Sequence, residues 1–370
     1  MTYFHVFWTK PCLPDPRTAA TEEIEFWDFE ALTWLVSALE ARRMGLIRLV
    51  TDSRGLLFAR RTGLEWVYNG GISTVLDEIP AVVDPRVFWA AGKLYAYRTI
   101  DSPCVGIDTD AILWRPLEPT GPVMALHVEN KAWPFYQMSP GDFARYGFNP
   151  ADWNWSLHPF NAGIVYFGQD EPRRFYADTA IRFMEAHGRT TPPTAGQGCD
   201  PMVFAEQRLL PMCMERLQVE VKPIAWLDPT GGHLARNATC THLWGAKSAY
   251  KLNAEARRAY VGFLIDRVRS RHPEALRTLA EWKLDRARPH APAPGPPSCA
   301  MSSAELESAR FSLLRKVHGV VWIEDPNVDV RRRATEGSLV WAPERIRPEP
   351  GASFELVVAG KDAVSIRQTE

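Results

Sequence analysis

The stretch Pro103-Cys104-Val105-Gly106-Ile107-Asp108-Thr109-Asp110-Ala111-Ile112-Leu113-Trp114 decides how the fold is interpreted. A short apolar run ends at two carboxylates one residue apart, and a second apolar run follows, which predicts a buried strand with an acidic tip. Residues i and i+2 of an extended segment point to the same side, so Asp108 and Asp110 can offer hard oxygen ligands to Mg²⁺ or Mn²⁺ held against a diphosphate. A D-x-D pair also occurs by chance in solvated turns, and only its place at a strand end favours a metal site.

Length and composition narrow the class of protein. The 370 residues suffice for one large domain with an appendage. The 43 Lys and Arg residues nearly cancel the 44 Asp and Glu residues, so we expect no nucleic acid partner and any anion must be bound by a local site. The six cysteines are scattered without metal-binding spacing, which is typical of buried thiols in a reducing compartment. Because no apolar run approaches the ~20 residues that span a bilayer, we expect a cytoplasmic protein with no transmembrane segment.

The chain before the acidic stretch alternates between predicted strands and helices. Residues 3–8 predict a strand, 22–43 a helix from the spacing of their apolar side chains, and 47–52 a second strand. Thr9 and Asp52 follow these strands, and doubly wound sheets bind nucleotides with polar residues at such strand ends. Glycine-rich dinucleotide and P-loop motifs follow neither strand, which disfavours dehydrogenases and P-loop enzymes. A helix is then predicted over 56–64 and a strand over 65–68.

A predicted helix over 85–99 leads directly into the acidic stretch and carries Lys93. That lysine belongs either to a solvated helix face or to a contact with a phosphate or carboxylate near the acidic pair. Strands are predicted over 123–128 and 160–168, and the second opens with Asn161-Ala162-Gly163, small residues that let the backbone approach a ligand. A helix over 175–187 precedes a helical segment that starts at Asp200 and carries Glu206 and Gln207.

The segment His242-Leu243-Trp244-Gly245-Ala246-Lys247 follows short strand candidates over 217–221 and 225–227. His242, beside a tight glycine and a cation, can add a nitrogen ligand to the metal, although the motif taken alone favours a core histidine. The aromatic residues between 133 and 155 suggest a wall on the acceptor side of the site, with ordinary core packing as the alternative for each ring.

The composition also divides the chain. Helices predicted over 254–270 and 273–285 complete a main domain over residues 1–285. Residues 286–303 are rich in Pro and Ala and predict a linker. Residues 304–370 predict a small α+β extension, with a helix over 304–317 followed by strand-like pieces, to which we assign no chemistry.

Four segments, in order along the chain, resemble the D-x-D, N-x-G and H-x-x-G signatures of the GT-A nucleotide-sugar glycosyltransferases, nearest to the glycogenin and LgtC-like galactosyltransferases. They are Ile107-Asp108-Thr109-Asp110-Ala111-Ile112-Leu113, Phe160-Asn161-Ala162-Gly163-Ile164-Val165, Glu206-Gln207 and His242-Leu243-Trp244-Gly245-Ala246-Lys247. The resemblance covers roughly residues 3–250. It implies an α/β, Rossmann-like mixed sheet flanked by helices and a hexosyltransferase-like activity that depends on Mn²⁺ or Mg²⁺.

The resemblance also implies roles for single residues. Asp108 would contact the ribose and the metal, Asp110 would be the main metal ligand, and His242 would complete the metal site. Lys247 beside Gly245 would neutralise the leaving diphosphate, and Asn161 and Gly163 would shape the sugar pocket. Asp200, Glu206 and Gln207 would lie around the donor sugar and the acceptor. Two features depart from the family: only Ala246 separates Gly245 from Lys247, where the family has two residues, and the Pro-Trp after the lysine is absent.

The implied partners are a nucleotide-sugar donor, with UDP as the expected nucleotide, and an unknown glycan, lipid or protein acceptor. The resemblance slightly favours retention of the sugar's configuration. An inverting enzyme would need a carboxylate base, for which Asp200 or Glu206 could serve. Two alternatives remain: a nucleotidyl- or phosphotransferase with the same acid pair, and a nucleotide-sugar-binding protein without turnover.

Overall fold

The computed structural model of the chain describes residues 1–13, 24, 26–132, 134–191, 200–225, 239–243 and 246–282, and in the C-terminal part residues 311–318, 321–325, 330–333, 339–341, 345–350, 352–358 and 364–367. Among these residues, no helix combines the length and the apolar character needed to cross a membrane.

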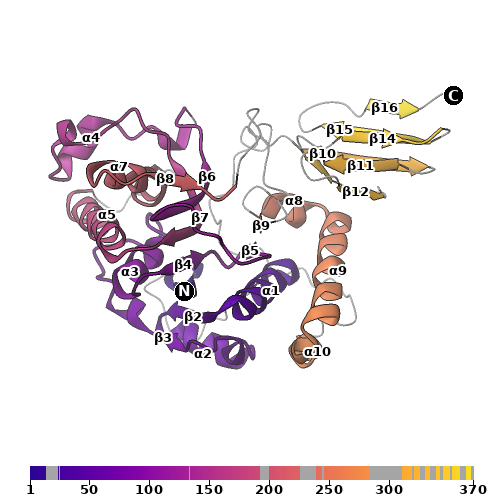
Figure 1. Ribbon diagram of the computed structural model, residues 1–370, viewed down its shortest axis with the longest axis horizontal. Coiled ribbons are helices and arrows are strands. Elements are labelled where there is room, and N and C mark those ends of the chain that lie inside the picture. Colours follow the sequence, from indigo (N-terminus) through magenta and orange to yellow (C-terminus); the bar gives the residue numbers. More distant parts are fainter. Residues whose placement is uncertain are drawn as a thin grey trace.

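A seven-stranded sheet in the order β3-β2-β1-β4-β7-β6-β8 forms the centre of the protein (Figure 1). Its strands are β1 (Thr2–Phe7), β2 (Leu46–Thr51), β3 (Ile72–Ser73), β4 (Cys104–Ile107), β6 (Val123–Val128), β7 (Phe160–Phe167) and β8 (Val221–Pro223). β1 pairs in parallel with β2 and β4, whereas β7 is antiparallel to both β4 and β6. The predicted α/β class, a mixed sheet flanked by helices, is therefore confirmed.

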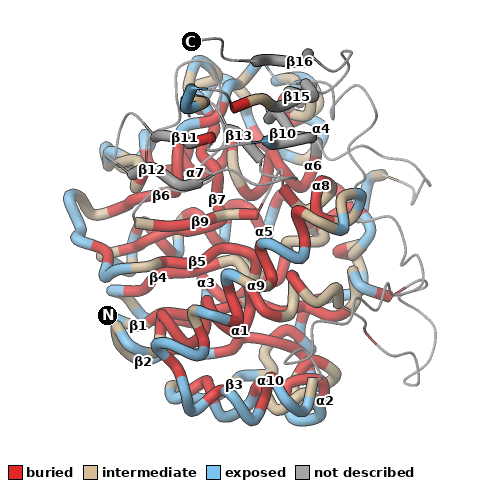
Figure 2. Tube along the Cα trace, turned by 90° about the vertical axis from the view of Figure 1, so that its right-hand side faces the viewer, coloured by how far each residue is buried: buried red, intermediate tan, exposed pale blue. Residues whose placement is uncertain are grey.

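Helices cover both faces of this sheet (Figure 1). On one face lie α1 (Asp28–Met44) and α9 (Ala254–Arg271), followed by α10 (Leu276–Glu281), and on the other lie α3 (Ala91–Thr99), α5 (Asp170–Thr190) and α7 (Leu209–Arg216). Successive side chains of β1 enter the two cores in turn, Tyr3 with α1 and Phe4 with α3. Because both faces are covered, β4 and β7 are buried along their whole length (Figure 2), which explains their unbroken apolar runs.

The direction of winding reverses beside β1. From β1 the chain moves outward through α1, β2, α2 (Ser53–Arg61) and β3, and α3 then returns it to β4 on the other side of β1. The carboxyl ends of β1 and β4 flank this switch point, and open α/β sheets bind ligands in the crevice outside such a point. Asp108 directly follows β4 there.

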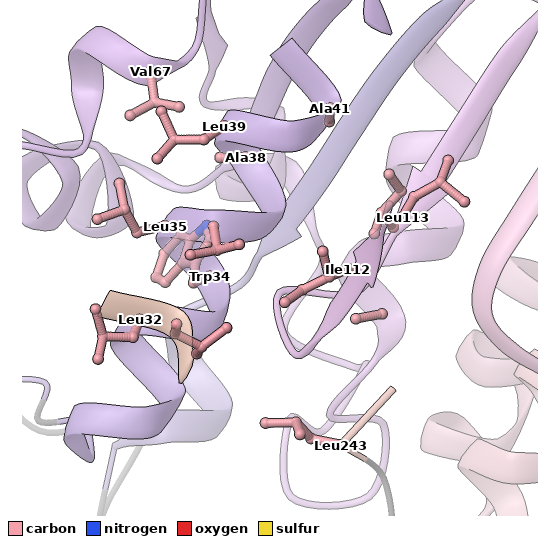
Figure 3. Close-up of a cluster of buried hydrophobic side chains, with 14 of the residues drawn as sticks. Leu32, Trp34, Leu35, Ala38, Leu39, Ala41, Val67, Ile112, Leu113 and Leu243 are labelled. Atoms are coloured by element: carbon pink, nitrogen blue, oxygen red, sulfur yellow. The ribbon is translucent and has the colours of Figure 1, made fainter. Parts of the chain in front are cut away.

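A two-stranded sheet of β5 (Ala111–Leu113) and β9 (Cys240–His242) packs against α1. Figure 3 shows Ile112 and Leu113 of β5 across from the apolar side chains of α1, with Leu243 nearby. Ile112 and Leu113 are almost completely buried, and full burial of such a side chain contributes roughly 1.5–3 kcal/mol. This packing fixes the backbone on either side of β5 and β9, including Asp110 and His242.

The described part of the C-terminal extension consists of strands. β10 (Phe311–His318), β13 (Leu339–Trp341), β15 (Ser353–Val358) and β16 (Val364–Arg367) form one sheet, and β11 (Val321–Asp325), β12 (Val330–Arg333) and β14 (Arg345–Pro348) form another. The helix predicted over 304–317 is wrong for residues 311–317. Their apolar run suits a helix or a strand, and antiparallel pairing with β15 makes it a strand. Residues 304–310 and the predicted linker over 286–303 lie outside the described residues.

Four other predictions need correction, the first being the helix predicted over 22–43, which begins only at Asp28. Residues 65–67 form a 3-10 helix rather than a strand, and the indole of Trp66 donates a hydrogen bond to Thr278 Oγ1 (3.2 Å) in α10. The helix predicted from residue 85 begins only at Ala91, because turns occupy the residues before it. The strand predicted over 217–221 begins at its last residue, since Leu217 closes α7 and Gln218 has a φ of 56°.

Candidate metal centre

Asp108 and Asp110 lie on a tight turn between β4 and β5. The amide of Asp108 donates to the Gly163 carbonyl (2.8 Å), and the Asp108 carbonyl accepts from the amide of Ala111 (2.9 Å). The Asp110 carbonyl accepts from the amide of Leu243 (3.0 Å), and the register of β5 with β9 sets His242 opposite Ala111. The small sheet thus brings His242 to the acidic pair from a segment far along the chain.

The carboxylates of Asp108 and Asp110 and the imidazole of His242 each offer one ligand atom, and these atoms lie within 4.8 Å of one another. Two carboxylate oxygens and one ring nitrogen suit Mn²⁺ or Mg²⁺, which bind their ligands at about 2.0–2.2 Å. Three protein ligands leave further positions of an octahedral ion open to a second molecule. The side chains present therefore fit a divalent cation, and the predicted convergence of these three residues is confirmed.

Lys247 lies beside this group at the start of α8 (Ala246–Leu252). Its Nζ is 2.7 Å from Oδ2 of Asp110, while Oδ1 of Asp110 faces His242 Nε2 at 3.6 Å. Burial works to raise the pKa of Asp110, but Lys247 and His242 outweigh it and hold that pKa well below its usual range. Asp110 therefore stays ionised, with Oδ1 directed towards His242 and Oδ2 paired with the ammonium group of Lys247.

Lys93 reaches the other carboxylate from α3. Its Nζ lies 2.7 Å from Oδ1 and 2.9 Å from Oδ2 of Asp108, and it also forms an ion pair with Glu206. Burial, together with the charges of Asp110 and Glu206, raises the pKa of Asp108 to about 6 against the opposing effects of Lys93 and His242. Of the two positions foreseen for Lys93, the structure places it in contact with a carboxylate of the acidic pair, with 15% of its side chain exposed.

Glu206 and Gln207 lie on a π-helical turn (Phe204–Arg208) between α6 (Asp200–Val203) and α7. The hydroxyl of Tyr176 donates to the carbonyl of Glu206, and Oε1 of Gln207 accepts from the hydroxyl of Tyr136. Single π turns inside helices are frequent at functional sites because they redirect side chains. Here the turn directs the Glu206 carboxylate to Lys93.

Gly163 forms the floor of the centre beneath His242. A Cβ added to Gly163 would lie 2.7 Å from Cε1 and 2.9 Å from Nε2 of His242, closer than real side chains come. The small residues of this segment thus allow a close approach of the His242 imidazole, and the approach of a ligand to this backbone stays a prediction. Asn161 is buried beside it, and its Oδ1 accepts from the Gly163 amide (3.0 Å).

The remaining predicted site residues are placed as follows. Asp52 caps α2 by accepting from the Gly55 amide (2.8 Å), and its Oδ2 accepts from the amide (2.9 Å) and hydroxyl (2.8 Å) of Thr9. Both residues are thus bonded to each other near the switch point, and their contact with a nucleotide stays a prediction. Asp200 begins α6, but its side chain lies outside the described residues, as does the whole of Gly245.

Sequence reasoning missed Glu129. Glu129 directly follows β6 and is 1% exposed, with Oε1 accepting from Asn161 Nδ2 (3.0 Å). The signal was available, since an acid after an apolar strand is the pattern that identified Asp108. Some of the aromatic residues expected to wall the acceptor side are instead buried in the core with α5. They include Phe143, Phe148 and Trp153. Trp133 lies outside the described residues.

The fold and the site define an α/β protein with a candidate metal centre at the switch point of its sheet. Residues 1–225 match a family of unknown function, DUF6734, and the chain belongs to that family. No curated protein matches the chain.

Two solved structures similar to this one are glycosyltransferases by name. The PaToxG glycosyltransferase gives a TM-score of 0.34 at 9% identity, over 58% of this chain and 69% of that one. Mouse xyloside xylosyltransferase 1, in its apo form, gives 0.31 at 10% identity, over 62% of this chain and 85% of that one. At these scores the likeness is too distant to carry an argument about function.

Proposed function

We propose that the protein is a metal-dependent glycosyltransferase that moves a sugar from a nucleotide diphosphate donor, with UDP as the expected nucleotide. The observation that carries this proposal is the meeting of Asp108, Asp110 and His242 at the switch point, with a lysine on each carboxylate. The order of the D-x-D, N-x-G and H-x-x-G segments supports the same activity. Mn²⁺ or Mg²⁺ is the expected ion.

The charges of the site suit a diphosphate. Three carboxylates (Asp108, Asp110 and Glu206) face two ammonium groups (Lys93 and Lys247), which leaves one net negative charge when all are ionised. A divalent cation changes this to one net positive charge, so the loaded site attracts an anion that the empty site repels. Binding of metal and nucleotide should therefore be mutually dependent.

Each residue then has a part in the transfer. The bound ion supplies a Lewis acid for the charge that develops on the departing diphosphate. Lys247, whose side chain is 40% exposed, lies where it can turn from Asp110 to a phosphate oxygen and stabilise the same charge. Lys93 holds Asp108 and Glu206 in fixed positions, and Asn161 with Gly163 shapes the floor on which the donor sugar would rest.

We favour retention of the sugar's configuration. An inverting enzyme requires a carboxylate base at the acceptor hydroxyl. Glu206 contacts Lys93 inside the protein and is 5% exposed, so it holds the lysine rather than facing an acceptor. The acceptor, whether glycan, lipid or protein, would approach from the side of Gln207 and Asp200.

Release of UDP from a panel of UDP-sugars, with Mn²⁺ or with a chelator, tests this function. The expected result is release only with the metal, together with thermal stabilisation by UDP and Mn²⁺, since a ligand at 100 times its dissociation constant stabilises by about 2.7 kcal/mol. If no nucleotide sugar is consumed and none stabilises the protein with any metal tried, the proposal is wrong.

A further inference from the structure

The strand that carries Gly163 bulges where it passes the metal centre. Ala125 of β6 pairs with Val165 and His127 pairs with Asn161, so β7 advances by four positions where β6 advances by two. On its other edge β7 keeps its pairing with β4 up to Ile164 opposite Ile107. The extra residues of β7 lie around Gly163, and such bulges are used to redirect backbone next to active sites.

A bulge leaves backbone groups without their strand partners, and side chains must satisfy them. The Gly163 amide donates to Oδ1 of Asn161 (3.0 Å), and the Gly163 carbonyl accepts from the amide of Asp108 (2.8 Å). Since Oδ1 of Asn161 faces a donor, its Nδ2 must face an acceptor, and that acceptor is Oε1 of Glu129 (3.0 Å). A buried chain of hydrogen bonds thus runs from Glu129 to the backbone of Asp108.

We propose that Glu129 is a positioning residue for the metal centre: it fixes the side-chain amide of Asn161, which holds the bulge of β7 beneath Asp108 and His242. This inference rests on the proposed metal-binding function. It adds to the site a residue that lies outside the group of metal ligands and outside the four segments that resemble glycosyltransferase signatures.

The surroundings of Glu129 argue against a role in folding alone. Among the described residues, its second oxygen, Oε2, is buried without a hydrogen-bond partner, a costly arrangement that a packing role does not require. Burial raises the pKa of Glu129 to about 8, with Asn161 opposing. At neutral pH the side chain is therefore mainly a neutral acid, so it can sit near the acidic centre and still accept from Asn161. His127 Nδ1 lies 3.8 Å from the same oxygen, Oε1.

The test is Mn²⁺ affinity of the purified protein without nucleotide, measured by electron paramagnetic resonance well below the melting temperature. Glu129→Leu removes the acceptor, and we expect Mn²⁺ binding to weaken by about 10–100-fold, the usual effect of losing a partner of metal ligands. Glu129→Gln keeps an oxygen for Asn161 Nδ2, so its affinity should stay within about threefold of wild type. Glu40→Gln is the matched control, because it removes a buried acid of α1 remote from the centre.

A second variant keeps the test decisive if Glu129→Leu does not fold. Glu129→Asp keeps a buried acid but shortens the side chain by one methylene group, which withdraws the acceptor from Asn161 Nδ2, so Mn²⁺ binding should weaken, whereas Glu129→Gln should keep it. Mn²⁺ affinity equal to that of wild type in Glu129→Leu, or in Glu129→Asp, overturns the inference while leaving the proposed function intact. A wild type that binds no Mn²⁺ overturns both.

Discussion

Nε2 of His242 lies 3.6 Å from Oδ1 of Asp110, although the two residues come from distant parts of the chain. The pairing of β5 with β9 produces this contact, and the packing of β5 against α1 holds it. The candidate metal centre is therefore built into the core rather than carried on a free loop. Substitutions in the backbone that supports the centre can therefore be tested separately from substitutions of its metal ligands.

Gly163→Ala tests the support. The new Cβ would lie 2.7 Å from Cε1 of His242, so the imidazole must move and Mn²⁺ affinity should fall by at least about tenfold. Gly262→Ala in α9 is the control, because a Cβ there meets nothing within 4 Å and should raise helix stability by about 0.5–1 kcal/mol. Titration of both variants with Mn²⁺ checks the prediction, and unchanged affinity of the Gly163 variant would show that His242 does not bind the ion.

Asp110→Asn tests the main ligand. The amide keeps the shape but loses the charge that holds the cation, so Mn²⁺ binding and metal-dependent UDP release should both disappear. The melting temperature should also fall, because the contacts with Lys247 and His242 that keep Asp110 ionised stabilise the folded state, so Mn²⁺ binding is measured well below it. Asp266→Asn, an exposed residue of α9, serves as the control in both assays. Turnover of Asp110→Asn at the wild-type rate would remove the chemical basis of the proposal.

The pH dependence of metal binding follows from Asp108. A carboxyl must lose its proton to bind a cation, and burial raises the pKa of Asp108 from 3.8 to about 6. Affinity for Mn²⁺ should therefore be constant well above pH 6 and fall as the pH drops through about 6, by up to about tenfold per unit. Titrations between about pH 8 and pH 5 measure this, and a flat profile over that range would exclude Asp108 as a ligand.

Glu40 of α1 contacts Arg267 of α9 and His272, the residue that follows α9. Its buried carboxylate accepts from Arg267 Nε (2.9 Å) and lies 3.3 Å from His272 Nε2, and despite burial these partners lower its pKa from 4.5 to about 2. Because the pKa of Glu40 is lower in the folded than in the unfolded state, its ionised form stabilises the fold at pH values above 4.5. This contribution is lost as the pH falls from 4.5 towards 2. Glu40→Gln should reduce the free energy of unfolding by roughly 2–3 kcal/mol near pH 7 and by less in acid. Urea denaturation of wild type and Glu40→Gln near pH 7 and in acid below pH 4.5 checks this. A loss of unfolding free energy that does not shrink in acid contradicts it.

Local patterns predicted much of the fold. The strands at β1, β2, β4, β6 and β7 and the acidic tip of β4 follow from short apolar runs that end in polar residues, and these signals lie within a few adjacent positions. His242 was predicted through the order of segments, since nothing in its own surroundings separates a ligand from a core histidine. The failures are the segments whose structure depends on distant partners. Residues 311–317 became a strand through pairing with β15, and the importance of Glu129 depends on a bulge in another strand.

The most direct test of the account is a crystal structure with Mn²⁺ and UDP, in which anomalous scattering locates the ion. The account predicts one anomalous peak about 2.0–2.4 Å from a carboxylate oxygen of Asp108, from Oδ1 of Asp110 and from His242 Nε2, with diphosphate oxygens on its open positions. A peak elsewhere in the protein, or UDP bound away from these three residues, would contradict the account.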